Sequence, residues 1–523
     1  MNPVVMLRTL LRAGVLGPGL PHRQVAQLHS LLRWGYGLGG ELRQAAKRSP
    51  GAVAVIDEER GPIRYADLLD RAEWVGYALR DLEVTAGRRV GLLARNHVGA
   101  IEVIAGASLV GLDVVLLNTG LSPEQIAVVA EEQQLAVLIH DDEFADLVAS
   151  LGAMVEVMGE SALVARVAAM ARQSPKPRLA PPARPGRTIV LTSGTTGAPK
   201  GAARRTPPGP SALVTIIDRI PLRAAETVLV SAPIFHTWGY AALQLAFGLR
   251  ATIVLQRRFD PALALRSWQT HDVDAMIAIP VMLQRILDLP EQDRANARPP
   301  RVIATSGSAY PQGFATRFMD AFGDILYNLY GSTEASWVCI ATPSELRRYP
   351  DTAGTPPIGT LVRVLDDDGV QVPEGVVGRV CAHNDMVFEG YTSGESSRPV
   401  ADLLATGDLG RVHDGLLFVV GRVDDMIVSG GENVYPMEVE SLLAEHPAVH
   451  EACVIGVPDE AFGQRLAAFV VRRPGASLSA EEVTDYVRAH RARHCIPREV
   501  HFVDDLPRNA TGKVLARELR ALL

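Results

Sequence analysis

The feature that most constrains the fold is a regular alternation of short apolar runs with stretches of helical period, which begins near residue 50. The runs Val53–Ile56, Val90–Leu93 and Val114–Leu117 are typical of buried strands, and helical periods follow the first two. Similar runs recur at 252–255, 275–279 and 301–304. Strands that alternate with helices predict mostly parallel sheets with helices on both faces, so the chain is expected to be α/β.

The pattern changes twice along the 523 residues, which are enough for several domains and a large core. From Gly354 to Val420, short strands with Gly, Asp and Pro turns predict a small β-barrel-like region. The residues after Arg422 suffice for a further domain of mixed strands and helices. We therefore predict an N-terminal helical extension (1–45), a large domain (46–422) of two doubly wound α/β subdomains plus the small β region, and a smaller α+β C-terminal domain (423–523).

Composition and charge exclude several classes of protein. The chain is 47% hydrophobic and 21% charged, as expected for a globular protein, and its net charge of −7 argues against nucleic-acid binding over the whole surface. Its four cysteines form no CxxC pair, which indicates reduced thiols and a cytoplasmic location. Arg8 and Arg12 interrupt the apolar N-terminal stretch, so no signal peptide is expected, and Glu102 and Asp113 argue against a membrane span at 100–117.

Residues 1–34 carry leucines at the three-to-four spacing of amphipathic helices, for example Leu7, Leu10 and Leu11. The segment is either a cap packed on its own domain or a surface helix in weak peripheral contact with lipid or an apolar substrate. A GxGxxG sequence follows at residues 35–40, but the preceding segment, Gln24–Trp34, has a helical pattern. A dinucleotide site needs a strand there, so none is expected.

The strongest functional signal is the segment Leu191–Gly201, which reads LTSGTTGAPKG and follows a strand-like run. Glycines allow close backbone approach, hydroxyl groups donate hydrogen bonds and the lysine adds a cation, so the segment predicts a polyphosphate cradle rather than a simple hairpin. It is not a Walker loop, because glycine follows the lysine where Ser or Thr is required. The candidate phosphate-binding residues are Thr192, Ser193, Gly194, Thr195, Thr196, Gly197 and Lys200.

This segment and others in the same order resemble the motifs of the adenylate-forming superfamily, which comprises acyl-CoA synthetases, luciferases and the adenylation domains of peptide synthetases. The similarity is greatest to bacterial acyl-CoA ligases and covers roughly residues 48–523. It implies ATP- and Mg²⁺-dependent conversion of a carboxylic acid to an acyl adenylate, followed by transfer to coenzyme A. The matching segments are Tyr330–Glu334 (YGSTE), Thr406–Asp408 (TGD), Gly421–Asp425 (GRVDD), Ser429–Val434 (SGGENV) and Asn509–Lys513 (NATGK).

The resemblance also implies roles for individual residues. Lys513 would stabilise charge on the reacting carboxylate and α-phosphate, while Asp408 and Arg422 would contact the ribose or phosphate. Glu334 and Thr192 would hold Mg²⁺. The adenine and nucleotide contacts would include Gly307, Ser308, Ala309, Asn328, Leu329, Tyr330, Gly331, Ser332 and Thr333, and the coenzyme A contacts Ser429, Gly430, Gly431 and Glu432.

Two further expectations follow from the resemblance. His236 would gate the passage between nucleotide and acyl group, and the small residues around it predict a long or bulky apolar acyl pocket. The C-terminal domain would pivot near Asp424, so that the two half-reactions use two orientations. The candidate substrate-binding residues are His236, Gly239, Tyr240, Gly307 and Ser336.

The sequence leaves the acceptor and the acid open. A carrier protein could replace coenzyme A, or the enzyme could stop at the adenylate. A non-catalytic nucleotide-binding homologue is a further alternative, although Lys513, Glu334 and Asp408 are all retained. The expected partners are a carboxylic acid, ATP and coenzyme A, without nucleic acid, and the oligomeric state stays open.

Overall fold

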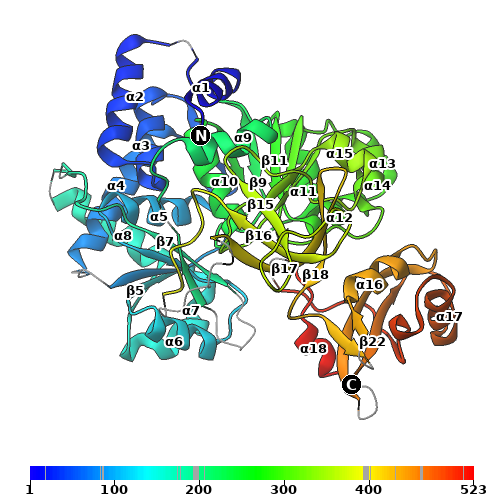
Figure 1. Cartoon of the computed structure of the whole chain (residues 1–523). Coiled ribbons are helices and arrows are strands. Elements are labelled where there is room, and N and C mark those ends of the chain that lie inside the picture. Colours follow the sequence, from blue (N-terminus) through cyan, green and yellow to red (C-terminus); the bar gives the residue numbers. More distant parts are fainter. Residues whose placement is uncertain are drawn as a thin grey trace.

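The computed structural model describes the whole chain except residues 18, 83, 85–87, 174, 177, 193–199, 205, 393–399, 401, 430–431, 460–462 and 510–511. Three sheets with their helices form the large part of the molecule, and a fourth sheet lies in a separate C-terminal unit (Figure 1). The predicted α/β class is therefore confirmed.

The first sheet has six strands in the order β6-β5-β3-β4-β7-β8, and all neighbours are parallel except β7 and β8. As predicted, the apolar run Val114–Leu117 forms a strand, which follows the buried helix α5 in the sequence. The elements are β3 (Arg89–Leu93), α5 (Val98–Leu109), β4 (Val114–Leu116), α6 (Pro123–Glu132), β5 (Leu135–His140), η1 (Asp142–Phe144), α7 (Ala145–Val148), η2 (Ala149–Ala153), β6 (Glu156–Gly159), α8 (Glu160–Gln173), β7 (Thr188–Thr192) and β8 (Lys200–Ala203).

The second sheet has eight strands in the order β14-β13-β12-β11-β9-β10-β1-β2, with a parallel centre and antiparallel edge pairs. Its elements are β1 (Val53–Asp57), β2 (Gly61–Arg64), α4 (Tyr65–Asp81), α9 (Ser211–Arg219), β9 (Thr227–Val230), α10 (Thr237–Gly248), β10 (Thr252–Leu255), α11 (Pro261–Thr270), β11 (Ala275–Ala278), α12 (Pro280–Leu287), α13 (Glu291–Ala295), β12 (Val302–Thr305), α14 (Phe314–Phe322), β13 (Leu326–Tyr330), β14 (Cys339–Ala341) and α15 (Pro343–Arg348).

The small β region is an antiparallel sheet in the order β15-β16-β17-β18, and the C-terminal unit is a five-stranded sheet with helices. Strand β17, which carries Asp408, was not predicted from the sequence, whereas the apolar runs 361–365, 378–382 and 416–420 were expected to be strands. The elements are β15 (Leu361–Leu365), β16 (Gly378–His383), β17 (Leu404–His413), β18 (Leu416–Arg422), β19 (Ile427–Ser429), β20 (Glu432–Val434), α16 (Pro436–Ala444), β21 (Val449–Asp459), β22 (Gly463–Arg472), α17 (Ala480–His490), η3 (Arg493–Cys495), β23 (Glu499–Phe502) and α18 (Ala516–Arg520).

The N-terminal segment folds into three helices, α1 (Pro3–Arg12), α2 (Pro21–Trp34) and α3 (Leu38–Arg48). The helices predicted within residues 1–34 are therefore confirmed. The boundary expected between residues 45 and 46 falls inside α3, whose Leu38, Leu42 and Ala45 are buried in the main core. Among the helices that the structure describes, none has the length and apolar character needed to cross a membrane.

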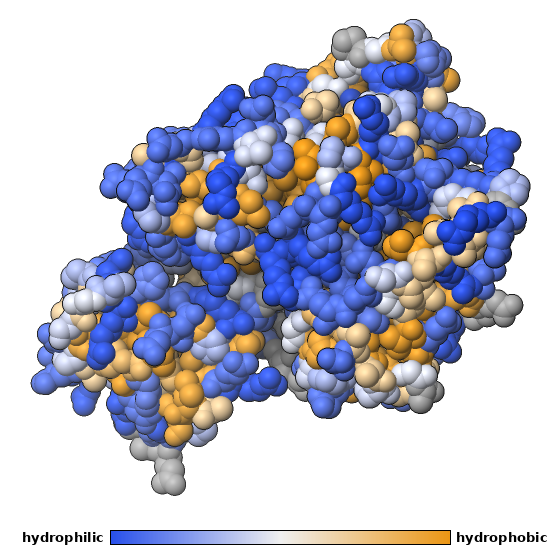
Figure 2. All heavy atoms as spheres, turned by 180° about the vertical axis from the view of Figure 1, so that it is seen from behind, coloured by the Kyte–Doolittle hydropathy of each residue, from blue (hydrophilic) through white to orange (hydrophobic). Residues whose placement is uncertain are grey.

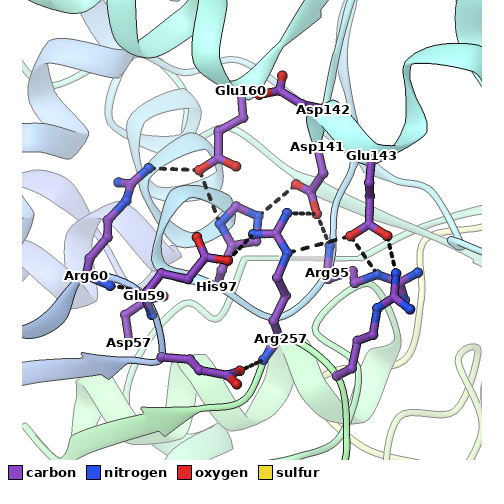
Figure 3. A network of polar contacts seen from close by, with 12 residues as sticks. Asp57, Glu59, Arg60, Arg95, His97, Asp141, Asp142, Glu143, Glu160 and Arg257 are labelled. Atoms are coloured by element: carbon purple, nitrogen blue, oxygen red, sulfur yellow. Dashed lines mark hydrogen bonds and ion pairs between the residues drawn. The ribbon is translucent and has the colours of Figure 1, made fainter.

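A network of ion pairs joins the two large sheets (Figure 3). His97, which precedes α5, places Nε2 2.8 Å from Asp141 Oδ1 and Nδ1 3.4 Å from Glu160 Oε1. Arg257, which follows β10 of the other sheet, brings Nη2 to 3.1 Å from Asp141 Oδ2. The backbone N–H of Arg95 also donates to Asp141, at 3.0 Å. Since the Asp141 side chain is only 2% exposed, water screens these pairs little.

Replacing Asp141 with alanine is expected to destabilise the protein by about 3 kcal/mol, because it leaves His97 and Arg257 without their shared carboxylate in a buried setting. Thermal and urea unfolding of the purified variant would measure the loss. Arg258→Ala is the matched control: that guanidinium is 68% exposed and pairs with Glu143 at the surface, so its removal should change stability by less than about 1 kcal/mol. Equal unfolding midpoints for the two variants would contradict the expectation.

Candidate functional site

A cavity of about 1500 Å³ lies where the two large sheets, the small β region and the C-terminal unit approach one another. In the view from behind, the C-terminal unit is a lobe with a hollow between it and the rest of the molecule (Figure 2). Motifs far apart in the sequence meet in the wall of this cavity. The predicted site residues in the wall are Thr192, Lys200, His236, Gly239, Tyr240, Gly307, Leu329, Gly331, Ser332, Thr333, Glu334, Ser336, Arg422, Asp424 and Lys513.

The carboxyl ends of parallel strands place the nucleotide motifs at one edge of the cavity. Gly307 follows β12, and Leu329 and Gly331 lie at the end of β13, as is usual for ligand sites in open α/β sheets. Thr192 ends β7 and pairs with Lys200, the first residue of β8, so both flank the phosphate segment. The predicted contacts Ser193 to Gly197 lie outside the described residues. Ser308, Ala309 and Asn328 are sequence neighbours of the residues in the wall.

Asp408 on β17 is the centre of a hydrogen-bonded group. Its Oδ2 accepts a hydrogen bond of 2.6 Å from the Tyr330 hydroxyl, and Arg422 Nη1 lies 3.3 Å from its Oδ1. Burial raises the pKa of Asp408, while the Tyr330 hydroxyl and the charges of Arg422 and Lys513 oppose that rise. Gly407 has a φ of +81°, and a Cβ there would lie 2.9 Å from Arg422 Nη2. Gly407 lies in the cavity wall, and the turn that it forms beside the buried Asp408 therefore requires glycine.

Glu334 lies beside the phosphate segment. Its Oε1 accepts a hydrogen bond of 2.8 Å from the Tyr391 hydroxyl, and the Lys200 ammonium lies 5.7 Å from the centre of the Tyr391 ring. The Thr192 hydroxyl donates to the Lys200 carbonyl at 3.2 Å and also faces the cavity. A carboxylate and a hydroxyl oxygen beside a polyphosphate segment fit Mg²⁺, which takes few protein ligands in addition to phosphate oxygens.

His236 precedes α10 and is half-buried in the cavity wall. Burial lowers the pKa of the imidazole to about 4, so the ring is neutral near pH 7. Its Nε2 makes no hydrogen bond to any described residue. The ring is therefore an uncharged polar group in the cavity wall.

Arg204, which is buried in the wall of the same cavity, was not predicted from the sequence. Burial lowers its pKa to about 10, against the opposing effects of Tyr240 and Glu334. Its Nη2 donates to Ser336 Oγ at 2.5 Å, and that hydroxyl donates to the Met386 carbonyl at 2.5 Å. The small size of Ser336 had indicated space for substrate. Its hydroxyl instead binds the buried guanidinium of Arg204. The available signal was the arginine pair Arg204-Arg205, which follows the phosphate segment within four residues.

Of the two predicted motifs in the C-terminal unit, the one that ends at Lys513 reaches the cavity wall, and the described residues of the one that begins at Ser429 do not. Lys513 lies in the wall, and its backbone N–H donates to Asn509 Oδ1 at 2.9 Å. The loop packs closely on the large domain: a Cβ on Gly512 would lie 2.6 Å from Val281 Cγ1 of α12. Ser429 and Glu432 belong to the β19–β20 hairpin and are not among the described residues of the wall, while Gly430 and Gly431 lie outside the described chain.

Comparison with known proteins agrees with this architecture. Residues 42–392 match the AMP-binding enzyme family, and residues 438–513 match the AMP-binding enzyme C-terminal domain. The chain therefore belongs to the AMP-binding enzyme family, and the resemblance to bacterial adenylate-forming acyl-CoA ligases is confirmed.

Similar proteins include feruloyl-CoA synthase of an Amycolatopsis species, with 31% identity over 492 residues, which cover 92% of this chain and 98% of the relative. The 2-succinylbenzoate–CoA ligase of Bacillus cereus is also 31% identical, over 92% of this chain and 98% of that protein. Among solved structures, o-succinylbenzoate CoA synthetase of Bacillus subtilis in complex with its acyl-adenylate intermediate has a TM-score of 0.81 and 28% identity, with 92% of this chain and 97% of that chain covered.

Proposed function

We propose that this protein is an AMP-forming acid–thiol ligase. A carboxylate oxygen attacks the α-phosphorus of ATP to give an acyl adenylate and pyrophosphate. The thiol of coenzyme A then attacks the acyl carbon, forms the thioester and releases AMP. The observation that carries the proposal is the single cavity whose wall holds Lys513, Glu334 and His236, next to the buried Asp408.

The residues of the cavity can meet the electrostatic demands of the first step. Two anions must approach, so fixed positive charge lowers the barrier. Lys513 supplies a mobile ammonium and Arg422 a permanent guanidinium, which Asp408 orients. Asp408 has two carboxylate oxygens for the ribose hydroxyls, with Tyr330 holding one of them in place. Neutral His236 can donate the N–H of its imidazole to the reacting carboxylate without adding positive charge.

Glu334 and Thr192 would hold Mg²⁺, which when bound neutralises charge on the phosphates. The remaining assignments also belong to this proposal. The phosphate segment 192–200 binds the β- and γ-phosphates, and residues 307–309 and 328–330 surround the adenine. The SGGEN hairpin receives coenzyme A after the C-terminal domain (423–523) rotates against the large domain (46–422).

Coenzyme A is the preferred acceptor, because curated relatives that span almost the whole chain are CoA synthases and ligases. Loading of a carrier protein, or arrest at the adenylate, remains the alternative from the same class. A catalytically inactive nucleotide-binding homologue is the alternative from another class.

The test is pyrophosphate release from ATP with a panel of fatty, aromatic and polycyclic acids, with and without coenzyme A. We expect acid-dependent pyrophosphate release and, with coenzyme A present, an acyl thioester detectable by mass spectrometry. Pyrophosphate release without any thioester would favour the carrier-protein or adenylate-only alternative. If no acid in the panel raises pyrophosphate release above that of the Lys513→Ala variant, the catalytic proposal fails.

A further inference from the structure

The acyl end of the cavity is not closed by the family fold alone. The family match begins at residue 42, yet residues of α1, α2 and the segment between them lie in the cavity wall. Residues of α9 and α10 line the same part of the wall, and Figure 1 shows α1 close above α9 with α2 at the upper left. The wall on this side contains Leu10, Leu28, Leu31, Leu213, Ile216 and Leu245.

The contacts of the N-terminal helices with the large domain fix this wall in position. Thr9 Oγ1 donates to Asp218 Oδ1 at 3.3 Å, and Arg12 Nη2 lies 3.4 Å from the same oxygen. From α2, Gln27 Nε2 donates to Gln44 Oε1 at 2.6 Å, and Gln44 in turn donates to the Phe247 carbonyl at 2.9 Å. Both helices are therefore anchored to α9, α3 and α10 rather than lying loosely on the surface.

The polar groups in this part of the wall are hydrogen-bonded within the protein. Gln44 also donates to Glu41 Oε2 at 3.1 Å, and the Arg48 guanidinium donates to the Gly17 carbonyl at 2.9 Å. Burial raises the pKa of the Glu41 carboxyl to about 8, against the lowering effects of Gln44 and Arg250, so this group is mostly protonated near pH 7. Polar groups that already have hydrogen-bond partners in the protein can border an apolar ligand at smaller cost than unpaired groups.

The size of the cavity also favours an extended occupant. Ligand pockets usually measure roughly 300–1000 Å³. The volume of about 1500 Å³ exceeds that range, as expected for a site that receives a nucleotide and a long acyl group together. A small acid would leave the region beside Leu10 and Leu31 unfilled.

We propose that α1 and α2 form the far wall of the acyl site, so that the substrate is an elongated apolar carboxylic acid whose distal end packs against Leu10, Leu28 and Leu31. This inference rests on the proposed ligase function and narrows its substrate class. It also assigns the N-terminal segment a part in substrate selection.

The chain offers a matched pair of variants on α2. Leu31 lies in the cavity wall, whereas its neighbour Leu32 is 77% exposed and outside it. Leu31→Trp should raise KM for hexadecanoic acid by about tenfold or more, because the indole fills the space of the distal end, and should leave KM for butanoic and benzoic acids unchanged. Leu32→Trp should behave like the unmodified protein with all three acids. Pyrophosphate release gives the kinetic readout.

A binding measurement separates failure of this inference from failure of the proposed function. Hexadecanoic acid should raise the thermal unfolding midpoint of the unmodified protein and of Leu32→Trp, but not of Leu31→Trp, whether or not any acid turns over. Leu28→Trp, at a wall position with a 58% exposed leucine, tests the same point if Leu31→Trp is misfolded. An equal effect of the wall variants on short and long acids, or no effect on either, would overturn the inference.

Discussion

Replacing Lys513 with alanine is expected to lower the rate of adenylate formation by about 10²–10³, the loss typical of one preorganised electrostatic donor. Lys513 lies in the cavity wall, and its positive charge lowers the pKa of the buried Asp408 carboxyl. The ammonium group is therefore placed to stabilise the charge that builds up between the substrate carboxylate and the α-phosphate. Pyrophosphate release under saturating ATP would measure the loss.

Measuring the second half-reaction, thioester formation from the acyl adenylate, tests the role of Lys513 more strictly. With chemically prepared acyl adenylate and coenzyme A, the Lys513→Ala variant should form thioester at close to the normal rate, because the lysine would have left the site by then. Arg520→Ala removes an exposed cation from the same unit and should change neither rate. Equal losses in both half-reactions for Lys513→Ala would contradict the two-orientation mechanism and leave Lys513 with a structural role.

The class of fold could be predicted from the sequence because local patterns decide it. Apolar runs such as Val90–Leu93 and Val114–Leu117 did become buried strands, and Gln24–Trp34 did become a helix that excludes a dinucleotide motif. Pairing between distant segments could not be predicted in the same way. Strand β1 lies parallel to β10, with Val55 beside Ile253. It therefore belongs to the eight-stranded sheet, although the strands that follow β2 in the sequence form the six-stranded sheet.

The candidate site could be predicted where its functional residues lie close together in the sequence, as in the short motifs. Residues from the motifs at 330–334, 406–408 and 509–513 do line one cavity, among them Gly331, Gly407 and Lys513, although their individual roles stay predictions. Arg204 and Tyr391 were not found, because their relation to Ser336 and Glu334 arises only from tertiary packing. The N-terminal leucines were open to two interpretations for the same reason: periodicity shows that a helix has an apolar face, but not what that face meets.

The expected pivot at Asp424, between the large domain and the C-terminal unit, allows a further test of the mechanism. Around it, the Val423 N–H donates to the Gly407 carbonyl at 3.0 Å and the Asp425 N–H donates to the Arg422 carbonyl at 3.3 Å. No backbone hydrogen bond from the Asp424 N–H is found among the described residues. The Asp424 side chain is 60% exposed, 3.7 Å from Arg422 Nη2. A proline at this position would therefore remove no backbone hydrogen bond from the orientation described here.

Asp424→Pro is accordingly expected to retain adenylate formation within a few-fold and to slow thioester formation from supplied acyl adenylate by roughly 10²-fold. The fixed φ of proline hinders the rotation that brings the SGGEN hairpin to the site, and a misplaced reactant costs a factor of this size. Asp424→Ala is the control, because it removes the same contact with Arg422 but keeps the backbone free, so both half-reactions should stay near normal. Normal thioester formation by Asp424→Pro would place the pivot elsewhere in the chain, whereas loss of adenylate formation would mean that proline distorts the cavity itself.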